Sequence, residues 1–410
     1  MPSVSFAGHT TLLEDLQENP ARYARQLERA KITPGFAQCR CHEDRPPLKL
    51  VIRRYGTLFH LAGWPDEGPL HRRDCDFHKT ARPTGSHAGK SLPGITATPD
   101  GLRARLDVAL EQRTIVPASK GTPRVAPGKV SRRAAPLLGF THALWEAGDL
   151  NRWSGVGTHR NWGACNAQIL AGIGDSVING QPADEVLHIM RRFQEADRDA
   201  INAEFDAFLA RVAAHNGANR RGIVVGEVAE VGTTQFGRAI TLRQSAKRYY
   251  AGNALIARVE QKYAHAWRAI GDREAKVIAC LVIERSTNGK HHVAVDLAAM
   301  LCSASFITCD SIHEVAMANR LVSERRMFEK PIRCRDGDAM LPDFILTDVV
   351  PATHIEMYGM NGMPEYEARK AKKRAIRVRD GIPVVEWNIE DPLTSVLLPP
   401  PAPRRPGRDR

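Results

Sequence analysis

Three of the eight cysteines, Cys39, Cys41 and Cys75, crowd into the first eighty residues, and this clustering constrains the fold more than any other feature of the sequence. Eight cysteines are too few for a disulfide scaffold in a chain of 410 residues, so their clustering favours metal ligation. Two apolar runs between Cys41 and Cys75, LKLVIRR and TLFHLAGW, flank Tyr55-Gly56 and predict a β-hairpin. A hairpin of this size is too small to fold alone, and a metal crosslink would supply the missing stability.

The spacing of the candidate ligands suits a tetrahedral zinc ion. Cys39 and Cys41, two residues apart in an extended segment, point to the same side. His71 and Cys75, four residues apart, share one face if their segment is helical. Three thiolates and one imidazole make a closed structural site with no position left for catalysis. Two alternatives to His71 stay open, His60 and His78.

The composition, with 43% hydrophobic and 25% charged residues, is that of a soluble globular protein. No apolar run approaches the roughly 20 residues that span a bilayer. The first residues lack a basic segment followed by an apolar stretch, so no secretory signal is indicated. We therefore expect a cytoplasmic protein without a membrane partner.

The hydrophobic periodicity predicts an α/β, multidomain chain. A helix is expected from Thr10 to Lys31, and the runs KVIACLVIERS and HHVAVDL are expected to be strands joined by an Asn288-Gly289 turn. The C-terminal domain is expected to be a mixed sheet flanked by helices. We divide the chain into a zinc-binding α+β module at 1–85, a basic Pro/Gly-rich linker at 86–135, a helical domain at 136–216, a β-rich segment at 217–305, an α/β domain at 306–392 and a disordered Pro/Arg tail at 393–410.

The positive charge is concentrated in two segments. Residues 117–135 carry +5 and residues 399–410 carry +3, together +8 of the net charge of +12. Basic segments of this kind commonly contact nucleic-acid phosphates, because the release of condensed counterions favours binding. Solvated linkers can have the same composition.

Two carboxylates in the C-terminal region predict a Mg²⁺ site. Asp343 lies on the expected strand LPDFILTD and Glu356 on the expected strand IEMYG. Antiparallel pairing of these strands would bring the two acids together, and carboxylate oxygens are the ligands that Mg²⁺ takes up together with substrate phosphate. Such an ion activates water for attack on the phosphate.

The helix expected after Glu356 carries residues that can assist this site. They lie on one face of the helix, and Lys373 is favoured over Lys370 as the group that stabilises the nucleophile. The face consists of Tyr366, Arg369, Lys370 and Lys373.

The segment resembles the PD-(D/E)xK nuclease superfamily, particularly the variant whose lysine lies on the following helix. Pro342, Asp343, Glu356 and Gly359 match its motif. The resemblance implies that Asp343 and Glu356 bind metal in a restriction-endonuclease-like sheet, assisted by Tyr366, Arg369 or Lys373. The chain departs from the pattern at Tyr358, where lysine is usual. An acid from the preceding segment sometimes joins such a site, and Glu314, Glu324 and Glu329 are candidates.

The whole chain also resembles an uncharacterised bacterial protein family found on plasmids and integrative elements. The matching features are the four candidate zinc ligands, LLGFTHALWEAGDLNRW, THRNW, LPDF and IEMYG. This resemblance implies a mobile-element context and no defined substrate.

Some weaker features are expected to be structural. Tryptophans near basic residues, such as Trp145, Trp153 and Trp162, can bind nucleic acid by stacking on bases. Tryptophans spaced this closely more often lie in the hydrophobic core. His291 and His292, adjacent on a strand, point to opposite faces and make a poor metal pair. We expect ordinary core positions for Cys165, Cys280, Cys302, Cys309 and Cys334.

Two functions from different classes follow. The first is a Mg²⁺-dependent DNA phosphodiesterase of a mobile element. The second is a non-catalytic nucleic-acid-binding or assembly factor that retains a nuclease-like fold, since fold analogy alone does not separate the two.

Removing residues 399–410 should weaken DNA binding and flatten its salt dependence, because this segment contributes +3 to the net charge. Titrating DNA at several salt concentrations measures the slope. An unchanged slope would contradict a role for this segment in binding.

Overall fold

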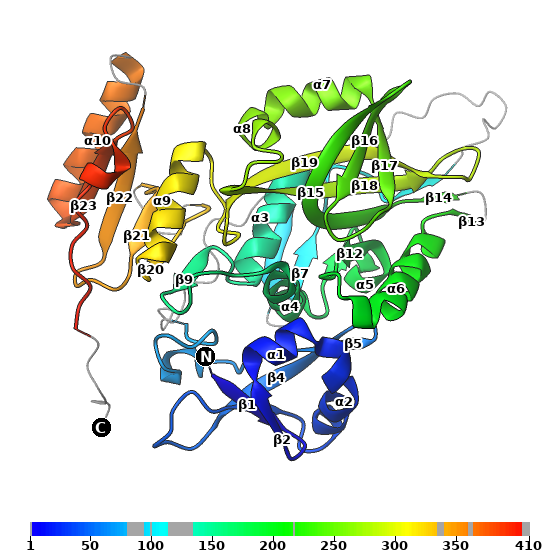
Figure 1. The fold of residues 1–410 in the computed structure, drawn as a ribbon, viewed down its shortest axis with the longest axis horizontal. Coiled ribbons are helices and arrows are strands. Elements are labelled where there is room, and N and C mark those ends of the chain that lie inside the picture. Colours follow the sequence, from blue (N-terminus) through cyan, green and yellow to red (C-terminus); the bar gives the residue numbers. More distant parts are fainter. Residues whose placement is uncertain are drawn as a thin grey trace, which may run out of the picture.

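The computed structural model describes residues 2–79, 94–98, 101–113, 134–215, 218–333, 340–359 and 364–403. Much of the basic segment 117–135, the tail cations from Arg404 onward, and Cys334 lie outside the described residues. The described chain is mixed α/β, with several sheets and helices α1 to α10 (Figure 1). None of the described helices combines the length and the apolar character that crossing a membrane requires.

The N-terminal unit is a five-stranded sheet covered by short helices, with a hydrophobic core of its own. Its strand order is β2-β1-β3-β4-β5, and the predicted hairpin at Tyr55-Gly56 is confirmed. The elements are β1 (Ser3–Phe6), β2 (His9–Leu12), α1 (Leu13–Glu18), α2 (Ala24–Ile32), β3 (Ala37–Cys39), β4 (Leu48–Tyr55) and β5 (Leu58–Gly63).

The single helix predicted from Thr10 to Lys31 is wrong. Residues up to Leu12 pair with β1 as a strand, and the helical part breaks at Asn19-Pro20. Proline has no N–H for the helix ladder, and its ring disfavours helical backbone in the preceding residue. A 3-10 turn (Pro20–Tyr23) therefore separates α1 from α2.

The middle of the chain is helical only in part. Helices α3 (Leu137–Ala147), α4 (Trp162–Ile173) and α6 (Arg198–Arg211) form as expected. The stretch expected to continue as helix after α5 (Ala183–Val186) turns into strand β12 (Leu187–Ile189), because Leu187 and Ile189 extend a buried sheet. Within the expected linker, strands β6 (Ile95–Thr98) and β7 (Gly101–Ala104) form a hairpin that joins the core. The short strands are β8 (Glu111–Arg113), β9 (Arg152–Ser154), β10 (Val177–Ile178), β11 (Gln181–Pro182), β13 (Ala214–His215) and β14 (Ala218–Arg220).

The three bulky tryptophans of this region are core residues, as expected. Trp145, Trp153 and Trp162 are all buried, and the Trp145 ring nitrogen donates to the Phe306 carbonyl. The four cysteines outside the N-terminal cluster that the structure describes are buried as well.

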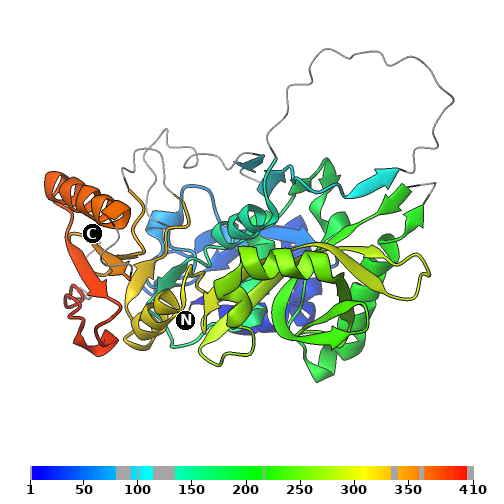
Figure 2. The ribbon, with the colours of Figure 1, turned by 90° about the horizontal axis from the view of Figure 1, so that it is seen from above.

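A closed barrel follows. Its strands run β15-β16-β17-β19-β18, and β18 pairs back onto β15. Helices α7 (Asn253–Lys262) and α8 (Ala264–Arg268) connect β17 to β18 and pack against the barrel (Figures 1 and 2). The predicted hairpin around Asn288-Gly289 is confirmed as β18 and β19. The strands are β15 (Gly222–Thr234), β16 (Gly237–Leu242), β17 (Arg248–Gly252), β18 (Ala275–Arg285) and β19 (His292–Ser303).

The C-terminal unit is a mixed sheet of order β23-β22-β21-β20-β9. Both views show it between α9 (Ile312–Ser323) and α10 (Pro364–Asp380) (Figures 1 and 2). The sheet is antiparallel except for β22 and β23, which α10 joins in parallel. Its own strands are β20 (Met327–Glu329), β21 (Phe344–Leu346), β22 (Thr353–Tyr358) and β23 (Val384–Asn388), and the edge strand β9 comes from the middle of the chain.

Replacing Gly172 with alanine should destabilise the protein by about 1–3 kcal/mol, the usual cost of overpacking. A methyl group there would overlap the backbone carbonyl of Ala147, where α4 approaches the end of α3. Urea unfolding measures the free-energy change. Gly232→Ala, on an open strand position, is the matched control. Equal stability of the two variants would contradict this close approach.

Candidate functional site

The side chains of Cys39, Cys41, His71 and Cys75 form one compact cluster. Their ligand atoms all lie within 4.8 Å of one another, and all four residues are buried. Sγ of Cys39 lies 3.7 Å from Sγ of Cys75, and Nδ1 of His71 lies 3.5 Å from Sγ of Cys41. Three thiols and an imidazole at these separations can hold a metal such as zinc.

A strand and a turn bring these residues together. Cys39 ends β3 and Cys41 follows two residues later. The segment of His71 and Cys75 is not helical, the condition under which spacing alone would place them on one face. It turns through hydrogen bonds from Cys75 N to Arg72 O and from His78 N to Cys75 O. The turn makes His71, rather than the alternatives His60 or His78, the histidine of the cluster.

The three thiols of the cluster lie close enough to shift one another's pKa values in opposite directions. Contacts with the thiols of Cys39 and Cys75 lower the pKa of Cys41, and the contact with Cys41 raises the pKa of Cys39 to about 12. One thiolate thus shares protons with neighbouring thiols, and thiolates are the form that binds zinc. The backbone N–H of Arg72 also donates to Sγ of Cys41. The Nδ1 atom of His71 faces the thiols, which leaves Nε2 as the proton-bearing nitrogen of a ligating imidazole.

The second candidate site lies on the C-terminal sheet. Phe344 of β21 pairs with Ile355 of β22, so Asp343 and Glu356 continue the same register one residue further along. Phe344 and Ile355 are buried in the core. Because side chains alternate along a strand, Glu356 faces the other side, toward α10.

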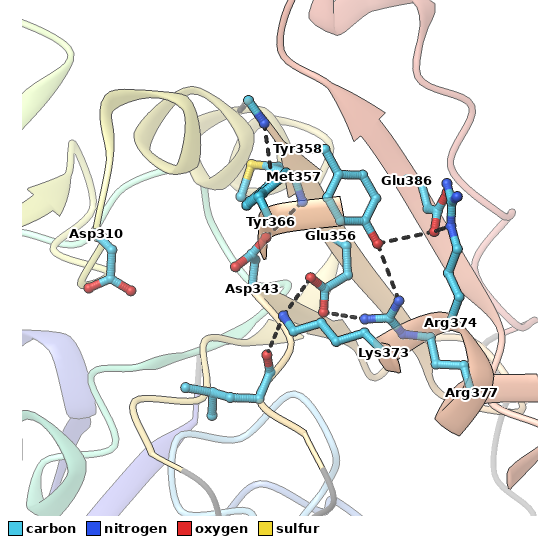
Figure 3. A network of polar contacts seen from close by, with 12 residues as sticks. Asp310, Asp343, Glu356, Met357, Tyr358, Tyr366, Lys373, Arg374, Arg377 and Glu386 are labelled. Carbon is cyan, nitrogen blue, oxygen red and sulfur yellow. Dashed lines mark hydrogen bonds and ion pairs between the residues drawn. The ribbon is translucent and has the colours of Figure 1, made fainter. Parts of the chain in front are cut away.

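Glu356 is buried, and both of its oxygens contact cations of α10. Oε2 accepts from Lys373 Nζ at 2.8 Å, and Oε1 is ion-paired with Arg377 (Figure 3). Lys373 also donates to the carbonyl of Leu341, two residues before Asp343, at 3.0 Å. Burial raises the pKa of Glu356, the neighbouring Asp343 raises it further, and the contacts with Lys373 and Arg377 oppose both effects.

Asp343 makes a different contact. Its Oδ2 accepts from the backbone N–H of Met357 at 2.7 Å. Figure 3 shows its carboxylate turned to that amide, while the carboxylate of Glu356 is turned to the helix cations. The two acids are therefore neighbours with separate partners, and among the described residues no third acid, histidine or cysteine completes a compact cluster with them.

The other residues predicted for this site surround Tyr358. Lys370 Nζ lies over the Tyr358 ring at 4.3 Å, and Arg369 lies over the ring of Tyr366. The hydroxyl of Tyr366 accepts from the N–H of Gly359 at 3.2 Å. Burial raises the pKa of Tyr358 to about 12, so its phenol stays protonated and donates to Glu386 at 3.1 Å. Tyr358 therefore does not supply the positive charge of the usual lysine.

Arg377, a buried side chain paired with Glu356, is not among the site residues predicted from the sequence. A signal was available, since Arg377 lies four residues after Lys373 and one further turn along the same helix face.

The three acids considered from the preceding segment each pair with a cation of their own. Glu314 is buried on α9, and Lys330 Nζ lies 2.7 Å from it and 3.1 Å from Asp310. Burial raises the pKa of Glu314 to about 7, and the charge of Asp343 contributes in the same direction. Glu324 and Glu329 instead pair with Arg320 and Arg152.

A family model described as "Protein of unknown function (DUF1173)" matches residues 13–390, which include all four cluster residues and the second site. No curated protein and no solved structure matches the chain.

Purified protein should contain about one zinc ion per chain, the stoichiometry of a closed four-ligand site. Replacing His71 with alanine should release the metal and destabilise the N-terminal unit, because the ion crosslinks two segments. Elemental analysis and thermal unfolding measure both effects. His78→Ala is the matched control and should keep its zinc. Negligible metal in protein prepared without chelator, or equal loss from both variants, would refute this assignment.

Proposed function

The chain belongs to the DUF1173 family, whose description assigns no chemistry, and from its C-terminal sheet we propose that it is a metal-dependent phosphodiesterase acting on DNA. The observation that carries the proposal is the placement of three residues. Asp343, just before β21, lies opposite Glu356 of β22, one step beyond the Phe344–Ile355 pair, and Lys373 of the crossover helix contacts Glu356.

The order of elements supports the same proposal. A helix, three antiparallel strands, a second helix and a parallel fourth strand follow one another as α9, β20, β21, β22, α10 and β23. This agrees with the resemblance to PD-(D/E)xK nucleases, in which a helix precedes a hairpin that carries the two acids. The second resemblance, to proteins of plasmids and integrative elements, suggests DNA of a mobile element as the substrate.

Asp343 and Glu356 offer carboxylate oxygens, which are the type of ligand that Mg²⁺ prefers. Two acids and two cations, Lys373 and Arg377, already balance in charge at this site. A divalent ion would add positive charge that an anionic phosphate offsets, so metal and DNA should bind together. When bound, the ion would polarise the phosphate and lower the pKa of a water molecule.

The chain's own residues have separate tasks in this proposal. Asp343 and Glu356 hold the ion, and Lys373, fixed by the Leu341 carbonyl, stabilises the negative charge that develops on the phosphate oxygens. Arg377 orients Glu356 from its buried position. Hydrolysis adds water across one P–O bond: the water oxygen joins phosphorus, and a proton ends on the leaving oxygen.

A specific observation favours the second candidate, a nucleic-acid-binding factor without turnover. The buried guanidinium of Arg377 satisfies Glu356 with a permanent charge, and Tyr358 occupies the usual lysine position. In this case the acid–base network would stabilise the sheet, and basic residues of α10 would contact phosphates.

A cleavage assay with Mg²⁺ or Mn²⁺ on single- and double-stranded DNA decides between the two. Asp343→Ala and Glu356→Ala should each lower the cleavage rate by about 100-fold or more, the scale of removing one catalytic electrostatic group. Glu365→Gln, at an exposed position at the start of α10, is the matched control. Cleavage that neither alanine variant affects would refute the phosphodiesterase proposal, and binding without any cleavage would support the second candidate.

A further inference from the structure

We infer that the barrel β15–β19 carries a second interaction surface, which binds single-stranded nucleic acid by stacking and charge. This inference goes beyond the proposed function and does not rest on it. The surface, called the barrel face below, consists of Phe236, Arg248, Tyr250, Lys290 and His291.

The barrel has the strand order of the OB fold. Numbered along the chain, its strands pair 1-2-3-5-4 and close from the fourth onto the first. The third and fifth strands pair in parallel, and the helical connection lies between the third and fourth. Barrels of this topology bind oligonucleotides or oligosaccharides across their second and third strands, with help from the loops between strands 1 and 2 and between strands 4 and 5. The topology therefore predicts the position of the binding face, and the residues on that face indicate which ligand it binds.

Strand β17 presents its outer face at this place. Ile240 and Tyr249 are paired and buried inside the barrel. Arg248 and Tyr250, on either side of Tyr249, therefore point outward. Tyr250 pairs with Ala239, and Ala239 in turn with Gly232, so its outer neighbours on two strands are small.

An aromatic pair joins this strand to the loop between strands 4 and 5. The rings of Tyr250 and His291 are 4.9 Å apart at 71°, and both side chains are half-buried. His292, in contrast, pairs with Tyr249 inside the barrel, as its position next to His291 on a strand requires. A base can stack on the open part of this aromatic pair.

The loop between strands 1 and 2 adds a third aromatic side chain. Phe236 lies at its tip and is 82% exposed. The adjacent Gly237 pairs with Gly252, two residues from Tyr250 on the same face of β17. An exposed phenylalanine has no role in packing the barrel, whereas a nucleic-acid base offers it a partner.

The charge of the barrel face complements a phosphate backbone. Two exposed cations nearby are ion-paired, Arg243 with Glu227 and Lys247 with Asp206. Arg248 and Lys290 are exposed and have no ion-pair partner within the described part of the chain. An acid, Glu230, lies on the same side beyond Thr241, which pairs with Arg248, and does not cancel both cations. Unpaired cations beside an exposed phenylalanine and a half-buried aromatic pair favour single-stranded nucleic acid over a neutral oligosaccharide.

The test is fluorescence anisotropy of the full chain with a labelled oligothymidylate of about 15 nucleotides, near the upper site size of one barrel. The buffer contains EDTA, so cleavage plays no part. Tyr250→Ala and Phe236→Ala should each weaken binding by about 5- to 100-fold, the effect of losing one stacked base. Tyr250→Phe keeps the ring and should bind like the parent. Arg248→Gln should lower the slope of log affinity against log salt by about 0.7.

Two controls keep the result specific. Arg29→Gln removes an exposed cation on α2, far from the barrel, and should not change binding. Glu365→Gln, at an exposed position at the start of α10, should also bind like the parent. Because EDTA removes divalent ions from this assay, failure of the cleavage proposal and failure of the barrel inference give different results. The inference is overturned if the parent does not bind the oligonucleotide, or if correctly folded Tyr250→Ala and Phe236→Ala, checked by circular dichroism, both bind as the parent does. Duplex DNA bound equally tightly and without dependence on the two rings would likewise overturn it.

Discussion

The burial of one carboxylate, Glu356, determines how the C-terminal unit is built. A charge removed from water costs several kcal/mol unless it is paired and hydrogen-bonded. Lys373 and Arg377 pair with this carboxylate from a single face of α10. These two ion pairs therefore favour packing of that face of the helix against the sheet. The same pairing places Tyr358 against Glu386 and Lys370 over the Tyr358 ring. Any function of this surface, catalytic or not, has to work with that charge balance.

The polar network extends to the other side of the sheet. Lys330, at the end of β20, is buried and pairs with Glu314 of α9. Burial opposes the charge of this lysine, and the carboxylates of Glu314 and Asp310 nevertheless raise its pKa, so it stays protonated. The field of Asp343 acts on Glu314, Lys330 and Glu356 alike. Asp343 therefore lies within electrostatic reach of two polar groups, one beside α9 and one beside α10.

The N-terminal unit is stabilised by a hydrophobic core of its own and by polar contacts with the rest of the chain. It has its own core, which includes the three clustered cysteines. It also joins the rest of the chain by polar contacts: Arg53 donates to the carbonyls at the end of α4, Tyr55 donates to Leu187, and Arg192 pairs with Glu18. A metal held by the cluster would crosslink β3 to the turn that carries Cys75 and so stabilise this small unit. The cluster offers three thiols and an imidazole, which suit softer metal ions than carboxylate oxygens do.

Local pattern was sufficient wherever neighbours in the chain decide the structure. The spacing of Cys39 and Cys41, the turn at Tyr55-Gly56, the hairpin at Asn288-Gly289 and the cationic face with Lys373 could all be read from residues a few positions apart. Local pattern could not predict which strands form the barrel, that β9 joins the C-terminal sheet, or that a strand forms at Leu187. In these cases long-range pairing overrides the local preference for helix or loop. The sequence by itself determined which side chains were available: soft ligands at one end, and two acids followed by a basic helix at the other. Only the tertiary structure decided that His71 completes the thiol cluster and that Arg377 shares Glu356 with Lys373, because both depend on the distance and burial that folding imposes on residues far apart in the chain.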